Sequence, residues 1–494
     1  MVGLLVGYSY PNAWIAAFCI CISLIISSLQ LFNKYRYAHW LSGFGLCLAL
    51  CGMGILGWIT YPNPYHKTLP TPGTYHGVAL QDAVEKPKTY QCITHLTDTA
   101  GNQYKSILYI AKDSVSATLQ EGTQFYVTLQ KVQPQTFAYY NKQYIYSSAY
   151  VTRNQWQIIA MPANGGLKSY AKQTKKHLLD TLQQHTDSSG YALTSAITLG
   201  HKASLKGTTK QYFSAAGISH ILAVSGLHVG IIYMVISLLL KPLASAKWAQ
   251  KVGQVVLILL LWGYAFLCGL PPSIVRAVIM FSVGAVGVIF HQTNQSINTV
   301  FFTAFAMLVY NPNYLFDMGF QLSFCAVIGI LCYVQHQNKG KSQGHKVISW
   351  IKDMCCISMV AQLSTLPLIL YYFGTFPTYF LLTNLLVVPL GTLLVYACLL
   401  LFLLSPIGIG HWLDTPIDLL VTLMQRIAQG ISQLPFAQIQ SVHTTLFQSL
   451  CLGVLLILGY AFCLKPQPKR LYPILLTIIV WLLVDIIFFI NFAL

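Results

Sequence analysis

Four side chains that could do chemistry lie close together near the middle of the sequence, among glycine and alanine residues. They are Ser219, His220, Ser225 and His228, and an unbroken apolar run follows them. A hydroxyl beside an imidazole can act as a nucleophile with its general base, and imidazoles also bind metals or line polar paths. Polar groups at membrane depth are costly unless they face water or a partner. This stretch is therefore the first candidate for a functional site.

The apolar run predicts that residues 218–240 form one membrane helix with these polar groups near its mouth. In such a helix His220 and His228, eight residues apart, share one face, and we expect both to line a pore. We expect no metal site here, because no further ligand residues lie nearby, and the sequence implies no cofactor.

The composition places the chain among membrane proteins. Of 494 residues 55 % are hydrophobic and only 8 % are charged, against about a quarter charged in soluble proteins. Several windows reach the ~18 apolar residues that span a bilayer as a helix. The fold class that we predict is a mainly α polytopic membrane protein with about ten transmembrane helices. The net charge of +17 fits basic cytoplasmic loops, attraction for a polyanion, or both.

The order of polar and apolar stretches divides the chain into five regions. We predict an N-terminal transmembrane hairpin (1–60), an extracytoplasmic all-β domain (61–165), amphipathic linker helices (166–216), a transmembrane core (217–404), and an amphipathic helix with C-terminal transmembrane helices (405–494). The short lysine-rich loops all fall on one side when the helices alternate, which puts the β domain outside. Pro389 and Gly391 predict a break in the core, with a half-membrane dip and return.

Alternating residues predict the strands of the β domain at 104–111, 124–132 and 144–152. Cations beside aromatic rings can hold single-stranded nucleic acid, although the same rings could form the core of a barrel. The candidates for external nucleic-acid binding come from this domain and from a basic amphipathic helix after it: Lys86, Lys88, Lys105, Lys142, Tyr144, Lys172, Lys175 and Lys176. A basic amphipathic helix also suits a membrane surface.

The stretch Ser-His-Ile-Leu-Ala-Val-Ser-Gly-Leu-His that begins at Ser219 resembles the signature of the ComEC/Rec2 competence family of bacterial DNA-uptake channels. Three later blocks resemble that family in the same order. They are a Gly-x-x-x-Ser-x-x-Arg-Ala block at 269–277, Asn-Pro followed by Gly-Phe-Gln-Leu-Ser-Phe at 311–324, and a last block between 362 and 389. Ordered blocks at consistent spacing make the resemblance specific.

The resemblance implies a channel in the bacterial cytoplasmic (inner) membrane that translocates single-stranded DNA inward during natural transformation, with an OB-fold in the β domain. It is not expected to be an enzyme. The predicted pore or DNA path comprises Ser219, His220, Ser225, Gly226, His228, Ser273, Arg276, Asp317, Gln321, Ser323 and Asn384. A charge within a membrane helix needs a partner, and Asp317 is the expected counter-ion of Arg276.

The sequence departs from many family members in one respect. It contains no His-x-His-x-Asp-His motif of the metallo-β-lactamase-like domain proposed to degrade the second strand. We therefore expect no nuclease activity from the purified chain. The partners expected are single-stranded DNA, the lipid bilayer, a periplasmic DNA receptor, and a separate nuclease or cytoplasmic helicase; a homodimer stays open.

Two alternatives remain at this point. The chain could be a transporter or flippase for another polyanion or a lipid-linked envelope precursor. It could also be an intramembrane serine hydrolase, because the residues around Ser225 resemble the Gly-x-Ser-Gly of rhomboid proteases. His228 lies only three residues further along the same predicted helix, whereas the rhomboid base comes from a separate helix.

Overall fold

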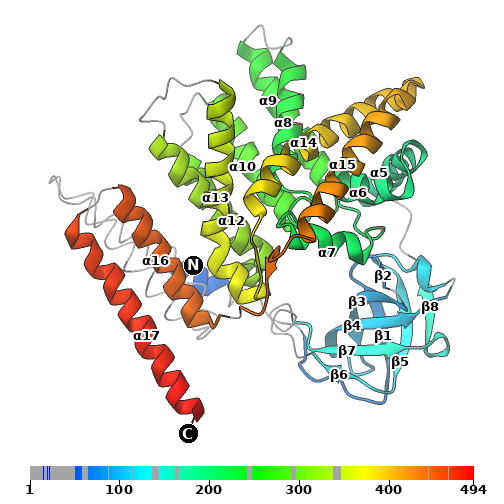
Figure 1. Ribbon diagram of the computed structural model, residues 1–494. Helices are drawn as coiled ribbons and strands as arrows, with labels where there is room; N and C mark the ends of the chain where they lie inside the picture. Colours follow the sequence, from blue (N-terminus) through cyan, green and yellow to red (C-terminus); the bar gives the residue numbers. More distant parts are fainter. Residues whose placement is uncertain are drawn as a thin grey trace. The chain divides into compact units, whose positions relative to one another are not determined.

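The structure is a computed structural model, and it describes residues 15, 19, 22, 51–57, 65–86, 88–113, 115–135, 144–161, 166–241, 247–290, 296–337, 346–442, 444–464 and 467–493. The chain forms two compact units. One contains residues 1–166 with 305–317, and the other contains residues 167–304 with 318–494. The strands of the β domain belong to the first unit and most helices to the second (Figure 1).

The β domain is one eight-stranded sheet in the described residues. The path of paired strands is β6-β7-β4-β3-β1-β5-β8, with β2 added to β3. All pairs are antiparallel except β4 with β7, which run parallel. The strands are β1 (Gly73–Ala79), β2 (Val84–Glu85), β3 (Thr89–Thr97), β4 (Gln103–Ala111), β5 (Gln124–Leu129), β6 (Gln133–Pro134), β7 (Ser147–Val151) and β8 (Trp156–Ala160).

Alternation along the strands builds the core of this domain. In β5, Phe125, Val127 and Leu129 are buried while the residues between them are exposed. Trp156 meets Phe125 edge to face at 6.2 Å between ring centroids. Burying one such side chain contributes about 1.5–3 kcal/mol. The predicted strands at 104–111, 124–132 and 144–152 are confirmed as β4, β5 and β7, with ends that differ by a few residues.

The turn between β3 and β4 is tied by one carboxylate. Asp98 accepts hydrogen bonds from the backbone N–H groups of Ala100 (2.9 Å) and Asn102 (2.8 Å), from the Asn102 amide (2.9 Å) and from the Tyr104 hydroxyl (3.0 Å). The side chain of Asn102, then its backbone and Tyr104, hold the pKa of Asp98 below its usual range. The ionised carboxylate therefore stabilises this turn.

The helices are long and connected by short segments. They are α5 (Leu167–His185), α6 (Ser188–Leu199), α7 (Gly207–Ala215), α8 (Gly226–Leu240), α9 (Lys247–Leu267), α10 (Pro272–Ile289), α11 (Ser296–Tyr310), α12 (Met318–Gln337), α13 (Lys346–Phe373), α14 (Phe380–Leu404), α15 (Asp414–Ser432), α16 (Leu446–Leu464) and α17 (Leu471–Ala493).

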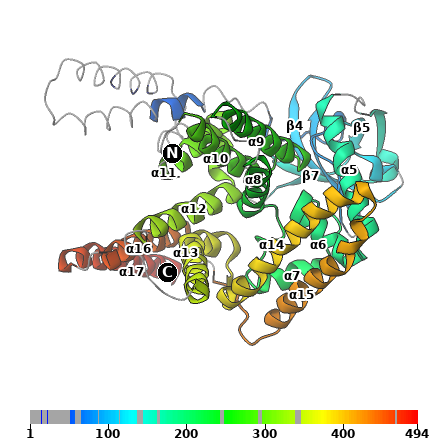
Figure 2. The ribbon, with the colours of Figure 1, turned by 90° about the horizontal axis from the view of Figure 1, so that it is seen from above.

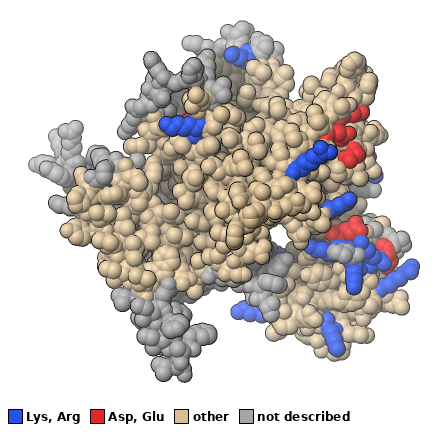
Figure 3. All heavy atoms as spheres, viewed as in Figure 1, with Lys and Arg blue, Asp and Glu red and all other residues tan. Residues whose placement is uncertain are grey.

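Six of the described helices are long and apolar enough to cross a membrane: Trp248–Leu267, Pro272–Ile289, Met318–Gln337, Ile348–Phe373, Phe380–Ile407 and Leu446–Cys463. Shorter apolar helices occur at Gly226–Leu240, Ile297–Tyr310 and Leu471–Leu482. On the face drawn in Figure 3 most of the helical part is uncharged, with a few charged side chains near its edges, whereas Lys and Arg gather on the β domain. The chain is therefore a multi-pass membrane protein with a β domain. The predicted hairpin at 1–60 lies outside the described residues except for residues 15, 19 and 22 and a helix at 51–57.

The predicted break at Pro389 is wrong, because α14 continues through this residue as one helix of 25 residues. A proline removes one helical hydrogen bond. Ending the helix at membrane depth would instead leave several backbone groups without partners in lipid, which costs more. Apolar residues on both sides of Pro389 therefore keep the helix intact.

A buried cluster joins α14 to α15 and α6, and these helices lie side by side (Figure 2). The amphipathic helix α15 buries one stripe with helical spacing: Ile417, Val421, Met424, Ala428 and Ile431. The cluster also contains Ile218 and Ile221, from the segment between α7 and α8. The candidate polar residues of that segment are thus anchored on a packed core.

Candidate functional site

The segment that carries Ser219 and His220 is a turn and not part of a helix. Helix α7 ends at Ala215 and is followed by Gly217 with φ +80°, after which the Ile218 N–H bonds the Phe213 carbonyl at 2.9 Å. The chain then turns, with Leu222 N–H bonded to the Ser219 carbonyl at 3.2 Å. The prediction of one helix over 218–240 is therefore wrong, because the backbone at Gly217 leaves the helical region and α8 begins only at Gly226.

Ser225 and His228 cap the start of α8. The backbone N–H of Ser225 donates to His228 Nδ1 at 2.9 Å, and the Ser225 side chain accepts from the His228 backbone. This reciprocal arrangement is a capping box in which imidazole replaces the usual Glu or Gln. His228 is only 2 % exposed, whereas His220 is exposed in the preceding turn. The two imidazoles do not share a helical face, contrary to the prediction.

The capping role bears on the serine hydrolase alternative. Ser225 Oγ lies 3.1 Å from His228 Nδ1, as in a nucleophile and base pair. However, Nδ1 already accepts the Ser225 backbone N–H, and a neutral imidazole has only one acceptor nitrogen. The nitrogen that faces the hydroxyl is thus engaged in holding the helix start, which disfavours proton abstraction from Ser225.

One face of α14 packs against the turn. A Cβ built on Gly217 would lie 2.9 Å from Phe380 Cβ, and one on Gly391 would lie 3.6 Å from a methyl of Ile221. Between these two contacts, on the same face, comes Asn384. It is 9 % exposed, and its Oδ1 is buried with no hydrogen-bond partner among the described residues. A buried amide oxygen therefore lies on the face of α14 that carries the polar turn.

The helix α10 contributes two of the predicted residues. Ser273 Oγ donates to the Val224 carbonyl at 3.1 Å, which ties the segment before α8 to the start of α10. Arg276, one turn later, is 5 % exposed; its Nη1 donates to the Gly319 carbonyl at 3.2 Å, and its guanidinium lies 5.4 Å from the Phe324 ring centroid. The buried arginine is thus held by a backbone carbonyl and an aromatic face of α12.

The remaining predicted path residues belong to α12 or precede it. Gln321 Oε1 accepts from the Tyr372 hydroxyl of α13 at 3.0 Å, so this amide joins two helices. Ser323 and Asp317 are half-buried; Asp317 follows a short 3-10 turn, Pro312–Phe316, directly before α12. Gly226, the first residue of α8, is exposed. The pairing of Asp317 with Arg276 stays a prediction.

The predicted cations of the β domain differ in their surroundings. Lys86 and Lys88 are exposed beside β2 and β3. Lys105 is half-buried with its Nζ 5.9 Å from the Tyr65 ring centroid, and burial lowers the pKa of its ammonium. Tyr144 also lies against Tyr65, at 6.4 Å between ring centroids. The predicted residue Lys142 lies outside the described residues.

A basic cluster, defined by Lys175, His201, Lys202 and Lys210, extends from α5 to α7. Burial first, and then the charge of Lys175, lowers the pKa of His201. Burial and Lys210 lower the pKa of Lys202 in the same way. On the same helix as Lys175, Lys172 is half-buried and Lys176 is exposed. Sequence reasoning missed Lys202 and Lys210, although cations at 202, 206 and 210 recur at helical spacing.

The comparisons with known proteins match the region that holds these helices. A family model described as Competence protein matches residues 197–466, which include the turn, Arg276, Gln321 and Asn384. The chain belongs to the competence protein family. That match does not extend over the β domain.

Two curated relatives are about a quarter identical to this chain over the aligned residues. ComE operon protein 3 of Bacillus subtilis (strain 168) is 26 % identical over 273 residues, which are 54 % of this chain and 34 % of that protein. An uncharacterized protein of Aquifex aeolicus (strain VF5) is 26 % identical over 265 residues, 53 % of this chain and 57 % of that protein. The chain thus spans about a third and just over half of their lengths. No solved structure matches.

Proposed function

We propose that this competence family member conducts single-stranded DNA through the cytoplasmic membrane into the cytoplasm during natural transformation. The observation that carries the proposal is the polar turn around Ser219 and His220. It is exposed, yet Ile218 and Ile221 anchor it to the core cluster, within the region matched by the family. Conduction of a polyanion needs polar groups that attract without trapping, and hydroxyl, imidazole and amide groups suit this better than rings of arginine.

The β domain is proposed to receive DNA outside the membrane. The path β7-β4-β3-β1-β5, with one parallel pair, supports an OB-type five-stranded Greek-key barrel. Exposed Lys86 and Lys88 supply phosphate contacts on this domain. The basic cluster of Lys175, His201, Lys202 and Lys210 supplies further contacts next to α7, which leads into the polar turn. Binding through such cations weakens as salt rises.

The test is natural transformation in a strain that lacks this chain, with labelled DNA located by compartment. We expect DNA to reach the periplasm and not the cytoplasm. Unchanged cytoplasmic DNA together with an envelope defect would replace the proposal with the flippase alternative.

Arg276 gives a site-specific version of this test. Arg276→Ala removes the guanidinium that donates to Gly319 and is expected to abolish uptake, while Arg276→Lys keeps a charge and part of the activity. Arg426→Ala, at an exposed position of α15, is the matched control and should leave uptake unchanged. Membrane levels of each variant are measured in parallel. Uptake that survives Arg276→Ala at normal protein level would remove this residue from the DNA path.

A further inference from the structure

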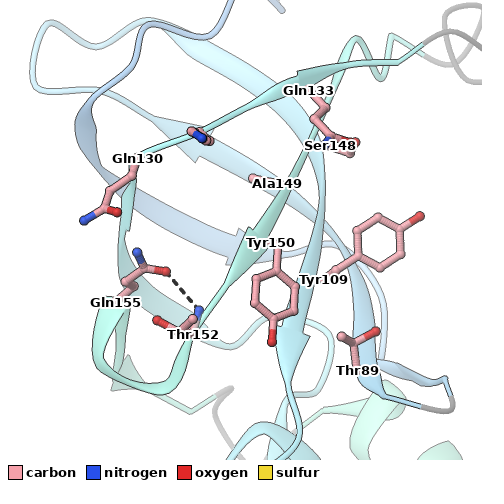
Figure 4. A pocket seen from close by; sticks show the side chains of 10 residues that line it. Thr89, Tyr109, Gln130, Gln133, Ser148, Ala149, Tyr150, Thr152 and Gln155 are labelled. Carbon is pink, nitrogen blue, oxygen red and sulfur yellow. Dashed lines mark hydrogen bonds between the residues drawn. The ribbon is translucent and has the colours of Figure 1, made fainter.

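A concave pocket lies on the outer face of the β domain and uses none of the cations assigned above. Its volume is about 620 Å³. Ten described residues from β3, β4, β6, β7 and the segments next to β5 and β8 line it (Figure 4): Thr89, Tyr109, Gln130, Lys131, Gln133, Ser148, Ala149, Tyr150, Thr152 and Gln155. A cavity of this size is large enough for a small organic ligand.

Two tyrosines form an aromatic wall of the pocket. Tyr109 on β4 and Tyr150 on β7 are register partners in the parallel pair. The residues beside them, Leu108, Ile110, Ala149 and Val151, are buried, so both rings lie on the outer face of the sheet. Tyr150 is 59 % exposed. Figure 4 shows the two rings next to each other on one side of the pocket. A flat ligand can therefore stack here.

Neutral hydrogen-bonding groups form the rest of the lining. Gln130, Gln133 and Gln155 supply amides, and Thr89 and Ser148 supply hydroxyls. The Oε1 of Gln155 accepts the Thr152 backbone N–H at 2.9 Å, which fixes the orientation of this amide (Figure 4). Of the ten described lining residues none is acidic and only Lys131 is charged.

We propose that this pocket binds one nucleotide of single-stranded DNA through its base, an inference that rests on the proposed function. A base needs an aromatic face for stacking and amides or hydroxyls for its hydrogen-bonding edge, and its phosphate needs one cation. The tyrosines, the glutamines and Lys131 provide these three in one site. A groove for the phosphate backbone alone would need several cations. A neutral glycan would need no cation.

The β domain would then make two kinds of contact with DNA, ionic contacts to phosphates and stacking contacts to bases. Exposed lysines bind phosphates, so their contribution falls with salt, by about 0.7 in log K per log salt for each single-strand phosphate contact. Stacking on Tyr150 does not release counterions. The pocket therefore adds a part of the affinity that depends on the presence of bases and persists when salt is raised.

The experiment measures binding of fluorescent oligonucleotides to the full chain in lipid nanodiscs by anisotropy. The probes are an oligothymidylate and an abasic strand of the same length and charge. Tyr150→Ala is expected to raise the Kd for oligothymidylate about fivefold or more, because stacking is worth about 1–3 kcal/mol per base. The Kd for the abasic strand should stay unchanged. Tyr126→Ala, at a 53 % exposed tyrosine of β5 outside the pocket, is the matched control and should change neither.

Lys131→Ala completes the set of variants. It should weaken the binding of both oligonucleotides and reduce the slope of log K against log salt by about 0.7. If wild-type protein binds both probes equally, or if Tyr150→Ala and Tyr126→Ala behave alike, the base pocket is refuted while the proposed function stands. Chitotetraose serves as a neutral glycan probe. If it binds wild-type protein but not Tyr150→Ala, and does not displace the oligonucleotides, the pocket is a glycan site and the proposal is overturned. If neither oligonucleotide binds wild-type protein, the proposed function fails first.

Discussion

Replacing His228 separates its capping role from any role of the imidazole in transport. The change His228→Ala removes the acceptor of the Ser225 backbone N–H, a bond of 2.9 Å at the first turn of α8. His228→Gln keeps an acceptor at the same position of the capping box, where Gln is a usual residue. The two variants therefore differ in the cap and agree in lacking the imidazole.

The destabilisation expected at the start of α8 follows from the hydrogen bond that His228→Ala removes. Ser225 is half-buried, and a buried donor left without an acceptor costs about 1–3 kcal/mol. Loss of a helix cap costs about 0.5–2 kcal/mol, which is largely the same interaction and is not added. Since 1.4 kcal/mol corresponds to a tenfold change, opening at the start of α8 should become about 5- to 150-fold more populated in His228→Ala. In His228→Gln it should remain near the wild-type value.

Amide hydrogen exchange followed by mass spectrometry measures this opening, in peptides that cover residues 222–230 of the protein in nanodiscs. Local openings expose single helix ends without global unfolding, so the effect should be confined to these peptides. Equal exchange in wild type and His228→Ala would refute the capping argument. If His228→Gln exchanges normally but abolishes DNA uptake, the imidazole itself is required for transport.

Three further predictions concern the turn, the β domain and Ser225. Gly217→Ala places a Cβ within 3.0 Å of neighbouring atoms at φ +80° and should destabilise the protein by at least about 1–2 kcal/mol in thermal unfolding, whereas Gly253→Ala, with nothing within 4 Å, should not destabilise it. Asp98→Asn should increase hydrogen exchange in the β3–β4 turn at neutral pH, because it removes the carboxylate that stabilises this turn. The folded pKa of Asp98 is depressed, so this stabilisation of the wild type is present above the unfolded pKa of about 3.9 and is lost as the pH falls through the folded pKa. Ser225 should resist fluorophosphonate labelling, since the acceptor nitrogen facing it holds the helix cap; labelling that disappears in Ser225→Ala would restore the hydrolase alternative.

Sequence patterns predicted what depends on local periodicity. The alternation in β5 reflects burial of every second residue and the apolar stripe of α15 reflects burial of one helical face, so these elements could be assigned in advance. That α9, α10, α12, α13, α14 and α16 can span a membrane follows from their length and composition alone.

Features that depend on backbone conformation, on the lipid environment or on strand register could not be predicted in this way. The helix boundary at Gly226 required the conformation of Gly217 and a capping box with His in place of Glu or Gln. The continuity of α14 through Pro389 depends on the absence of water rather than on propensity. The pocket depends on the register that places Tyr109 beside Tyr150, and nothing in either strand alone specifies this pairing.

The parallel pairing of β4 with β7 also determines when the β domain can close. The hydroxyls of Ser106 and Ser147 meet across this pair although they are 41 positions apart, and Thr74 meets Thr128 across 54 positions. Contacts between such distant residues form slowly, because the chain loses loop entropy before it gains the contact. During synthesis the edge of β4 stays unpaired until β7 has been made, and until then it can pair with other chains. The segment up to Val151 must therefore be synthesised without long pauses, because a pause before β7 would favour aggregation of the open sheet over closure of the domain.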